Sequence, residues 1–193
     1  MLLAIDVGNT QLVAGVWDGA SWRAVWRRGT VLSETEDELA AWLKSMFDLA
    51  SLPFRVEGVV VGSVAPALNA ALERMAVKWL GVATVFLEAG PELGLSVQYD
   101  PPTAVGADRI ANALAARASL SAPIVIVDFG TATTFDAISR DGSYVGGAIM
   151  PGIEIATKAL VGMTAKLPQF ELRVPERAIG RNTIESLQAG TML

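Results

Sequence analysis

The chain has 193 residues, with 15 Lys or Arg against 20 Asp or Glu for a formal net charge of −5, and it contains neither histidine nor cysteine. Without these two residue types it can form no Ser-His-Asp triad, His-ligated zinc site, thiolate nucleophile or disulfide, so carboxylates must carry any proton chemistry. Hydrophobic residues make up 52% of the chain, enough for the buried core of one large domain or two small ones.

The first half of the chain alternates short apolar runs with turn-forming residues. Asp18-Gly19 is typical of a hairpin turn, and Ser33 with Glu36 has the spacing of a capping box at the start of a helix. The expected strands cover residues 2–6, 11–17, 22–28, 59–63 and 82–87, and the expected helices cover residues 33–49 and 66–79. The first three strands are expected to form an antiparallel meander.

The second half begins with a connector over residues 89–102 and an Ala-rich helix expected over residues 103–120. The pattern of three short strands with an Asp-Gly turn, seen at the start of the chain, then recurs. The expected strands cover residues 124–127, 133–139 and 144–149, with a hairpin turn at Asp141-Gly142 and further helices from about residues 151 and 183.

Two features indicate an internal repeat. Asp6 and Asp128 each end an apolar strand and begin an Asp-x-Gly sequence that continues with Asn or Thr, and an Asp-Gly turn follows each at a similar distance. The chain is therefore expected to hold two copies of one unit. The second copy stops before the elements that would match residues 59–87, so it is expected to be incomplete.

The two repeated loops have the residue types of a phosphate site. Gly8 permits a sharp turn in which backbone N–H groups and the Thr10 hydroxyl can face one ligand. The Asp6 carboxylate would repel a phosphate unless Asp6 holds Mg²⁺, directly or through water. Taken alone, the first loop is more typical of a hairpin whose Asp caps its own turn. The second copy, with Asp128 and Thr131, favours two loops that hold a polyphosphate from both sides. Neither a P-loop nor a Rossmann fingerprint occurs.

Asp108 and Arg109 lie side by side early in the expected helix. A carboxylate there can accept the proton of an attacking hydroxyl while the guanidinium pairs with an anionic group, although a salt bridge alone is an equal alternative. Tyr99 can form a pocket wall or part of a rigid linker. The Gly-rich segment 146–152 can receive a ligand or simply turn the chain, and Thr183 is a plausible helix N-cap.

Composition also bears on partners. The apolar stretches are too short or too interrupted to cross a bilayer, and the N-terminus lacks the basic start of a secretory signal, so we expect a cytoplasmic protein with no membrane partner. Basic residues are scattered, which predicts no nucleic-acid partner.

With these motifs in order, the chain resembles the type III pantothenate kinases of the actin/sugar kinase/Hsp70 superfamily. The motifs are DVGNT, YDPP with GADR, DFGTATTFD, YVGGAIMPGI, TAKLP and IGRNT. The resemblance implies a duplicated ribonuclease H-like (actin-like ATPase) α/β fold, with mixed five-stranded sheets flanked by helices. Its N-terminal subdomain would cover residues 1–98 and its C-terminal subdomain residues 99–193.

The resemblance also implies an activity. A family member uses ATP to phosphorylate pantothenate to 4′-phosphopantothenate, the first step of coenzyme A biosynthesis, as a cytoplasmic homodimer with the substrate site at the interface. It requires Mg²⁺ and a monovalent cation, K⁺ or NH₄⁺. Members of the family continue for some tens of residues further than this chain, which adds to the expectation of a shortened second subdomain.

Residue roles follow by matching motifs. Asp108 matches the proton acceptor, and Asp128 matches the ligand of the monovalent cation. Thr183 is expected to contact pantothenate across the dimer interface. The residues that match the ATP site are Asp6, Val7, Gly8, Asn9, Thr10, Gln11, Leu12, Val13 and Thr131. The residues that match pantothenate contacts are Tyr99, Gly106, Ala107, Asp108, Arg109 and Thr183.

Two other functions compete with this one. A non-catalytic relative associated with transcriptional activation would have lost a catalytic carboxylate, whereas Asp6, Asp108 and Asp128 are all present. Another small-molecule kinase of the superfamily would lack the GADR sequence and a dependence on monovalent cations.

Overall fold

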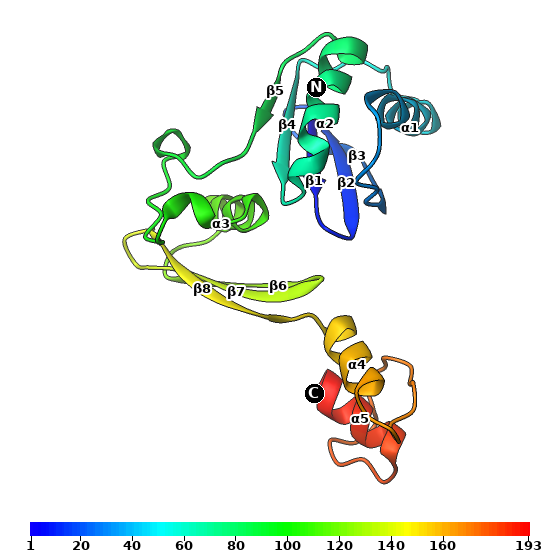
Figure 1. Cartoon of the computed structure of the whole chain (residues 1–193). Helices are drawn as coiled ribbons and strands as arrows, with labels where there is room; N and C mark the ends of the chain where they lie inside the picture. The colour runs from blue at the N-terminus through cyan, green and yellow to red at the C-terminus, as the bar shows by residue number, and fades with distance from the viewer. The chain divides into compact units, whose positions relative to one another are not determined.

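A computed structural model describes all 193 residues (Figure 1). Contacts divide the chain into two compact units. Unit 1 comprises Met1–Val125 and Asp136–Gly146, and unit 2 comprises Ile126–Phe135 and Gly147–Leu193.

Unit 1 contains a five-stranded mixed sheet in the order β3-β2-β1-β4-β5. Its strands are β1 (Leu2–Val7), β2 (Gln11–Trp17), β3 (Trp22–Gly29), β4 (Gly58–Ser63) and β5 (Thr84–Phe86). β1, β2 and β3 pair antiparallel, while β4 is parallel to both β1 and β5. The predicted meander and the mixed sheet are confirmed.

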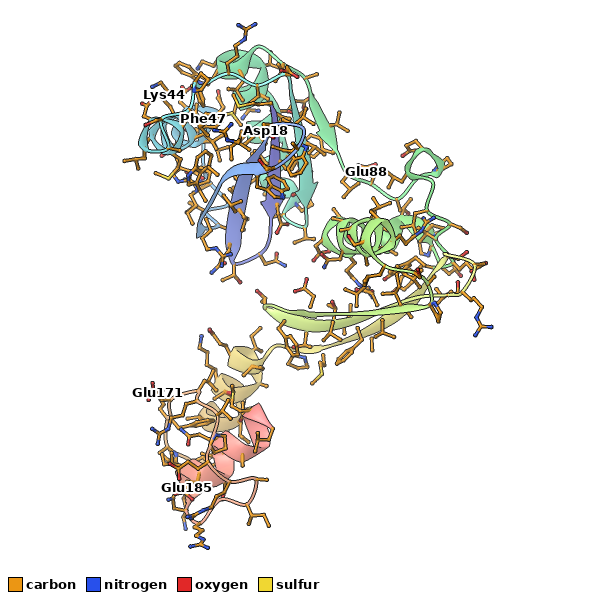
Figure 2. All side chains as sticks on the ribbon, turned by 180° about the vertical axis from the view of Figure 1, so that it is seen from behind. Asp18, Lys44, Phe47, Glu88, Glu171 and Glu185 are labelled. Carbon is orange, nitrogen blue, oxygen red and sulfur yellow. The ribbon has the colours of Figure 1, made fainter.

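One face of this sheet holds the core of unit 1. Along β1, Leu3, Ile5 and Val7 are buried while Asp6 is exposed, as expected when side chains alternate between the two faces of a strand. Helices α1 (Glu36–Leu49) and α2 (Asn69–Met75) contribute buried residues to the same core cluster. Figure 2 labels Lys44 and Phe47 on α1; the first side chain is exposed and the second is buried.

The start of α1 differs from the prediction. Thr35 is the N-cap residue and Glu38 completes the capping box, whereas Ser33 and Glu36 were expected to form it. The Glu38 carboxylate accepts the backbone N–H and the hydroxyl of Thr35, and these hydrogen bonds lower the pKa of Glu38. The predicted end of the helix at Leu49 is confirmed.

The segment expected to be one helix over residues 66–79 is built from three pieces. A 3₁₀ turn at Pro66–Leu68 leads into α2, and a π-helical turn at Ala76–Leu80 follows. Gly81 ends the segment with a φ of +69°, a left-handed conformation that glycine adopts without a Cβ clash. The prediction of one continuous helix is therefore wrong, although the three helical pieces lie where that helix was expected.

The connector to the second half contains two more 3₁₀ turns, Pro91–Leu93 and Pro102–Ala104. Helix α3 (Ala107–Ser119) begins after them, with Gly106 at its N-cap. The helix expected from residue 103 thus starts four residues later, because Pro102 opens a separate short turn.

The remaining strands form a three-stranded sheet in the order β6-β7-β8. They are β6 (Ile124–Phe129), β7 (Ala132–Ile138) and β8 (Tyr144–Pro151). Such short connections between neighbouring strands allow only antiparallel pairing, so this meander matches the internal repeat.

Unit 2 ends with helices α4 (Ile153–Gly162) and α5 (Thr183–Met192). Asn182 is the N-cap of α5, and its side-chain oxygen accepts the backbone N–H of Glu185. Thr183 was expected to be the cap and instead is the first helical residue. No helix of the structure has the length and apolar character needed to cross a bilayer.

Candidate functional site

The first predicted phosphate loop, residues 8–10, joins β1 to β2 at the carboxyl end of β1. The backbone N–H of Gly8 donates to the carbonyl of Gln11 at 2.9 Å, which closes the hairpin. Thr30, just after β3, donates its hydroxyl to the Gly8 carbonyl at 2.7 Å and its N–H to the Thr10 carbonyl at 3.0 Å. These bonds fix the loop backbone in unit 1.

The side chains predicted to bind ATP differ in exposure. Asp6, Asn9, Thr10 and Gln11 are exposed, Gly8 and Val13 are half-buried, and Val7 and Leu12 lie in the core. Val7 and Leu12 can therefore meet a ligand only through their backbone, and they act mainly as anchors of the loop.

The N-terminus of α3 lies beside this loop within unit 1. The backbone N–H of Val64 donates to the carbonyl of Val7 at 2.9 Å. A Cβ on Gly106 would lie 3.5 Å from Cγ1 of the same valine, and a Cβ on Gly62 would lie 3.8 Å from Cβ of Ala107. The carboxyl ends of the parallel strands β1 and β4 thus meet the start of α3, the end of such sheets where ligands commonly bind.

Asp108 is half-buried in the first turn of α3. Its Oδ1 accepts the backbone N–H of Arg109 at 2.8 Å. A carboxylate has two oxygens that can each accept hydrogen bonds, so this contact holds the side chain while Oδ2 can still accept a proton.

Arg109 belongs to a buried polar cluster with Asp136, Tyr144 and Tyr99. Asp136 is fully buried, and its Oδ1 accepts Nε of Arg109 at 2.9 Å, Nη2 of Arg109 at 2.5 Å and the Tyr144 hydroxyl at 2.6 Å. The rings of Tyr99 and Tyr144 have their centroids 6.0 and 5.8 Å from the guanidinium carbon, within range of a cation–π attraction.

Burial and the charge of Asp136 shift the pKa of Arg109 in opposite directions. Desolvation alone would lower the pKa of Arg109, but its hydrogen bond and charge interaction with Asp136 raise it above its ordinary value. Burial, followed by the hydrogen bond to Asp136, raises the pKa of Tyr144. The arginine stays cationic and the tyrosine stays protonated at neutral pH, so both remain donors to Asp136.

Asp136 and Tyr144 received no role from the sequence, although Asp136 ends the DFGTATTFD motif. The salt bridge joins residues 27 positions apart, a separation that helical or strand periodicity does not predict. The available signal was that Asp136 lies two residues before Ile138 in an expected strand. The two side chains therefore lie on the same face of the sheet, and a carboxylate on a buried face is unusual.

The second predicted phosphate loop, Gly130 and Thr131, joins β6 to β7 in unit 2. Asp128 and Thr131 are both exposed. The backbone N–H of Gly130 donates to the Ala132 carbonyl at 3.0 Å, and the N–H of Gly152 donates to the Thr131 carbonyl at 3.1 Å. The loop is therefore held against the N-cap of α4, which has no side-chain cap.

Gly152 lies so close to this loop that no other residue fits. A Cβ at this position would collide with the backbone carbonyl oxygen of Gly130 and would lie 2.5 Å from that of Thr131. We therefore expect Gly152→Ala to displace the second loop and to raise KM for ATP by about 10- to 100-fold, the cost of misplacing a binding group by about 1 Å. Steady-state kinetics with varied ATP measure this.

Gly162→Ala is the matched control, because that glycine ends the same helix and a Cβ there meets no atom within 4 Å. If Gly152→Ala leaves the KM for ATP unchanged, the second loop does not belong to the nucleotide site.

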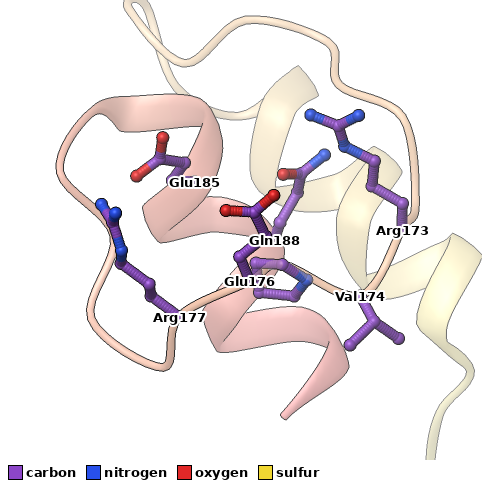
Figure 3. Close-up of a pocket in the computed structure, with 7 residues that line it drawn as sticks. Arg173, Val174, Glu176, Arg177, Glu185 and Gln188 are labelled. Carbon is purple, nitrogen blue, oxygen red and sulfur yellow. The ribbon is translucent and has the colours of Figure 1, made fainter.

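The last predicted contact, Thr183, is exposed at the start of α5. The same unit contains a cavity of about 340 Å³ between α5 and the segment before it (Figure 3). Its lining residues are Arg173, Val174, Pro175, Glu176, Arg177, Glu185 and Gln188. None of these residues was assigned a ligand from the sequence.

The structure brings part of the predicted site together. Within unit 1, Tyr99 and Arg109 share one cluster, and Asp108 starts the helix beside the first loop. Asp128, Thr131 and Thr183 belong to unit 2. No three carboxylates gather into a group that could hold a metal ion by themselves, so a cation site would need backbone or substrate oxygens as well.

Two solved structures share the fold. A Campylobacter jejuni protein described as a Baf family transcriptional activator has a TM-score of 0.59 at 21% identity, over 97% of this chain and 72% of that one. A Sinorhizobium meliloti protein described as a 2-dehydro-3-deoxygalactonokinase has a TM-score of 0.51 at 12% identity, over 85% of this chain and 57% of that one. The expected actin-like α/β fold is confirmed.

Sequence comparisons identify the family, whereas the structural neighbours show only the fold. A type III pantothenate kinase from Geobacillus sp. (strain WCH70) is 43% identical over 193 residues, which are 100% of this chain and 75% of the relative. Another from Anaeromyxobacter sp. (strain K) is 47% identical over 191 residues, 98% of this chain and 75% of the relative. A family model of type III pantothenate kinase matches residues 2–193. The chain belongs to the type III pantothenate kinase family.

Proposed function

We propose that this chain carries the site of an ATP-dependent pantothenate kinase that makes 4′-phosphopantothenate for coenzyme A biosynthesis. The primary hydroxyl oxygen of pantothenate attacks the γ-phosphorus of ATP. The bond from that phosphorus to the oxygen bridging to the β-phosphate breaks, and ADP leaves. Asp108 accepts the hydroxyl proton.

The observation that carries this proposal is the place of Asp108 at the start of α3, beside the first loop. Val64 donates its backbone N–H to Val7 at the end of β1, and its side chain lies near Gly106, so the proton acceptor and the proposed phosphate-binding backbone lie at one end of the sheet. Phosphoryl transfer depends mainly on positioning and charge neutralisation, so it needs no histidine and no cysteine.

The residues of the first loop fit ATP with a divalent cation. Asp6 is exposed at the carboxyl end of β1, where it can hold Mg²⁺ directly or through water. The exposed Asn9 and Thr10 can donate to phosphate oxygens, as can the backbone of residues 8–13. Mg²⁺ would neutralise charge on the phosphates, as it does in phosphoryl transfer generally.

The second loop supplies the other proposed contacts. Thr131 donates to ATP, and Asp128 holds the monovalent cation, K⁺ or NH₄⁺. The exposure of Asp128 near the end of β6 and of Thr131 in the turn that follows supports these roles.

Pantothenate is proposed to contact Tyr99, residues 106–109 and Thr183. Thr183 acts from the partner in a homodimer, which its exposed position on α5 supports. The proposed subdomains cover residues 1–98 and 99–193.

The test is an assay for ADP release by the full chain, with pantothenate, ATP, Mg²⁺ and K⁺. We expect ADP to form only when pantothenate is present and to fall when Na⁺ replaces K⁺. A sugar substrate serves as the control for another small-molecule kinase. If no ADP depends on pantothenate, the substrate is wrong; if Na⁺ replaces K⁺ without loss, the monovalent site is wrong.

A further inference from the structure

The buried pair of Arg109 and Asp136 is more elaborate than a simple ion pair. One oxygen of Asp136 accepts two N–H groups of the guanidinium and the Tyr144 hydroxyl, and both charged side chains are at most 8% exposed. Burying an ion pair has a large desolvation cost and often adds no net stability. The cluster is thus better explained by the orientation it imposes than by a gain in stability.

The hydrogen bonds to Asp136 restrict how the guanidinium can meet a ligand. Its Nε and Nη2 lie on one edge of the planar group, and this edge is the one bound to Asp136. The other edge, formed by Nη1 and the second N–H of Nη2, has the fork geometry that matches a carboxylate. Asp136 therefore determines which edge of Arg109 can face a substrate.

Tyr144 and Tyr99 restrain the cluster further. Tyr144 is fully buried on β8, and its backbone N–H and carbonyl bond to Ser96 and Gln98 at 2.8 Å each. This pairing places Tyr99 next to Gly146, where a Cβ would approach the Tyr99 ring to 3.5 Å. Backbone hydrogen bonds thus fix both rings beside the guanidinium, with their centroids 6.5 Å apart.

We propose that Asp136, held by Tyr144, is a positioning residue that orients Arg109 so that its opposite edge binds the carboxylate of pantothenate. The inference rests on the proposed function. Because Asp136 neutralises Arg109, recognition depends on the direction of the N–H groups more than on net charge. Loss of Asp136 should then weaken pantothenate binding even though it leaves Arg109 with an uncompensated positive charge.

The test uses Asp136→Asn and Tyr144→Phe in the full chain, with KM and kcat measured for both substrates and pantothenate Kd measured by calorimetry. We expect Asp136→Asn to raise the pantothenate KM and Kd by about 10-fold or more, as expected when one partner of a buried charged pair is lost. Tyr144→Phe should raise them by a smaller factor. The ATP KM should change less than about twofold in both.

Asp141→Asn is the matched control, because Asp141 is an exposed carboxylate in the turn of the same hairpin and bonds only to Ser139 and Ser143. A merely structural pair would lower the thermal midpoint and leave the pantothenate Kd unchanged, and that result overturns the proposal. If Asp136→Asn does not fold, an unchanged Kd in Tyr144→Phe overturns it instead. A wild-type chain without pantothenate turnover would refute the proposed function separately, before any variant is compared.

Discussion

Asp108→Asn is expected to lower kcat by about 10²- to 10⁴-fold, the usual contribution of a general base. Asn has an oxygen that can still accept the backbone N–H of Arg109, which Oδ1 of Asp108 accepts at 2.8 Å. The start of α3 should therefore keep its structure. What is lost is an anionic oxygen that can take the proton of the attacking hydroxyl.

The measurement is pantothenate-dependent ADP release, together with the thermal midpoint of the variant. Asp48→Asn is the control, because Asp48 is an exposed carboxylate near the end of α1 whose partner is Lys44 in an exposed pair. It should alter kcat by less than about twofold. Turnover of Asp108→Asn within about threefold of wild type would show that another group accepts the proton.

Much of unit 1 could be predicted because its signals are local. β2 has the predicted bounds, and β1 and β3 each extend one residue further, since apolar runs and an Asp-Gly turn mark their ends. The cap of α1 could not be chosen, because Ser33-Glu36 and Thr35-Glu38 have the same spacing. Only the structure shows which Thr or Ser side chain reaches the backbone.

Part of the candidate site could likewise be predicted from local sequence, and part could not. Asp108 and Arg109 could be predicted as a pair at the start of a helix, because they are adjacent in the chain. The sequence left open whether Arg109 forms a salt bridge or binds a ligand. The structure shows the salt bridge, to Asp136 on another element. Because a guanidinium has two usable edges, a salt bridge and ligand binding are compatible.

The core of unit 1 gives the second large prediction. Phe47 is fully buried on α1, with its ring centroid 5.2 Å from that of Trp26 and 5.3 Å from that of Phe54. Phe47→Ala should reduce the free energy of unfolding by about 3–5 kcal/mol, because it removes a buried ring and leaves a cavity. This is a large part of the roughly 5–15 kcal/mol that stabilises a typical domain.

Urea unfolding followed by tryptophan fluorescence measures this loss, since all five Trp residues belong to unit 1. Leu49→Ala is the control on the same helix, because Leu49 is 78% exposed and its loss should cost less than about 0.5 kcal/mol. Both variants shorten a hydrophobic side chain of α1, so the contrast isolates burial from helix propensity. Equal losses in the two variants would mean that the side of α1 facing the sheet has been misidentified. A selective loss in Phe47→Ala would show that the buried face of α1, packed against Trp26 of β3 and Phe54, stabilises unit 1.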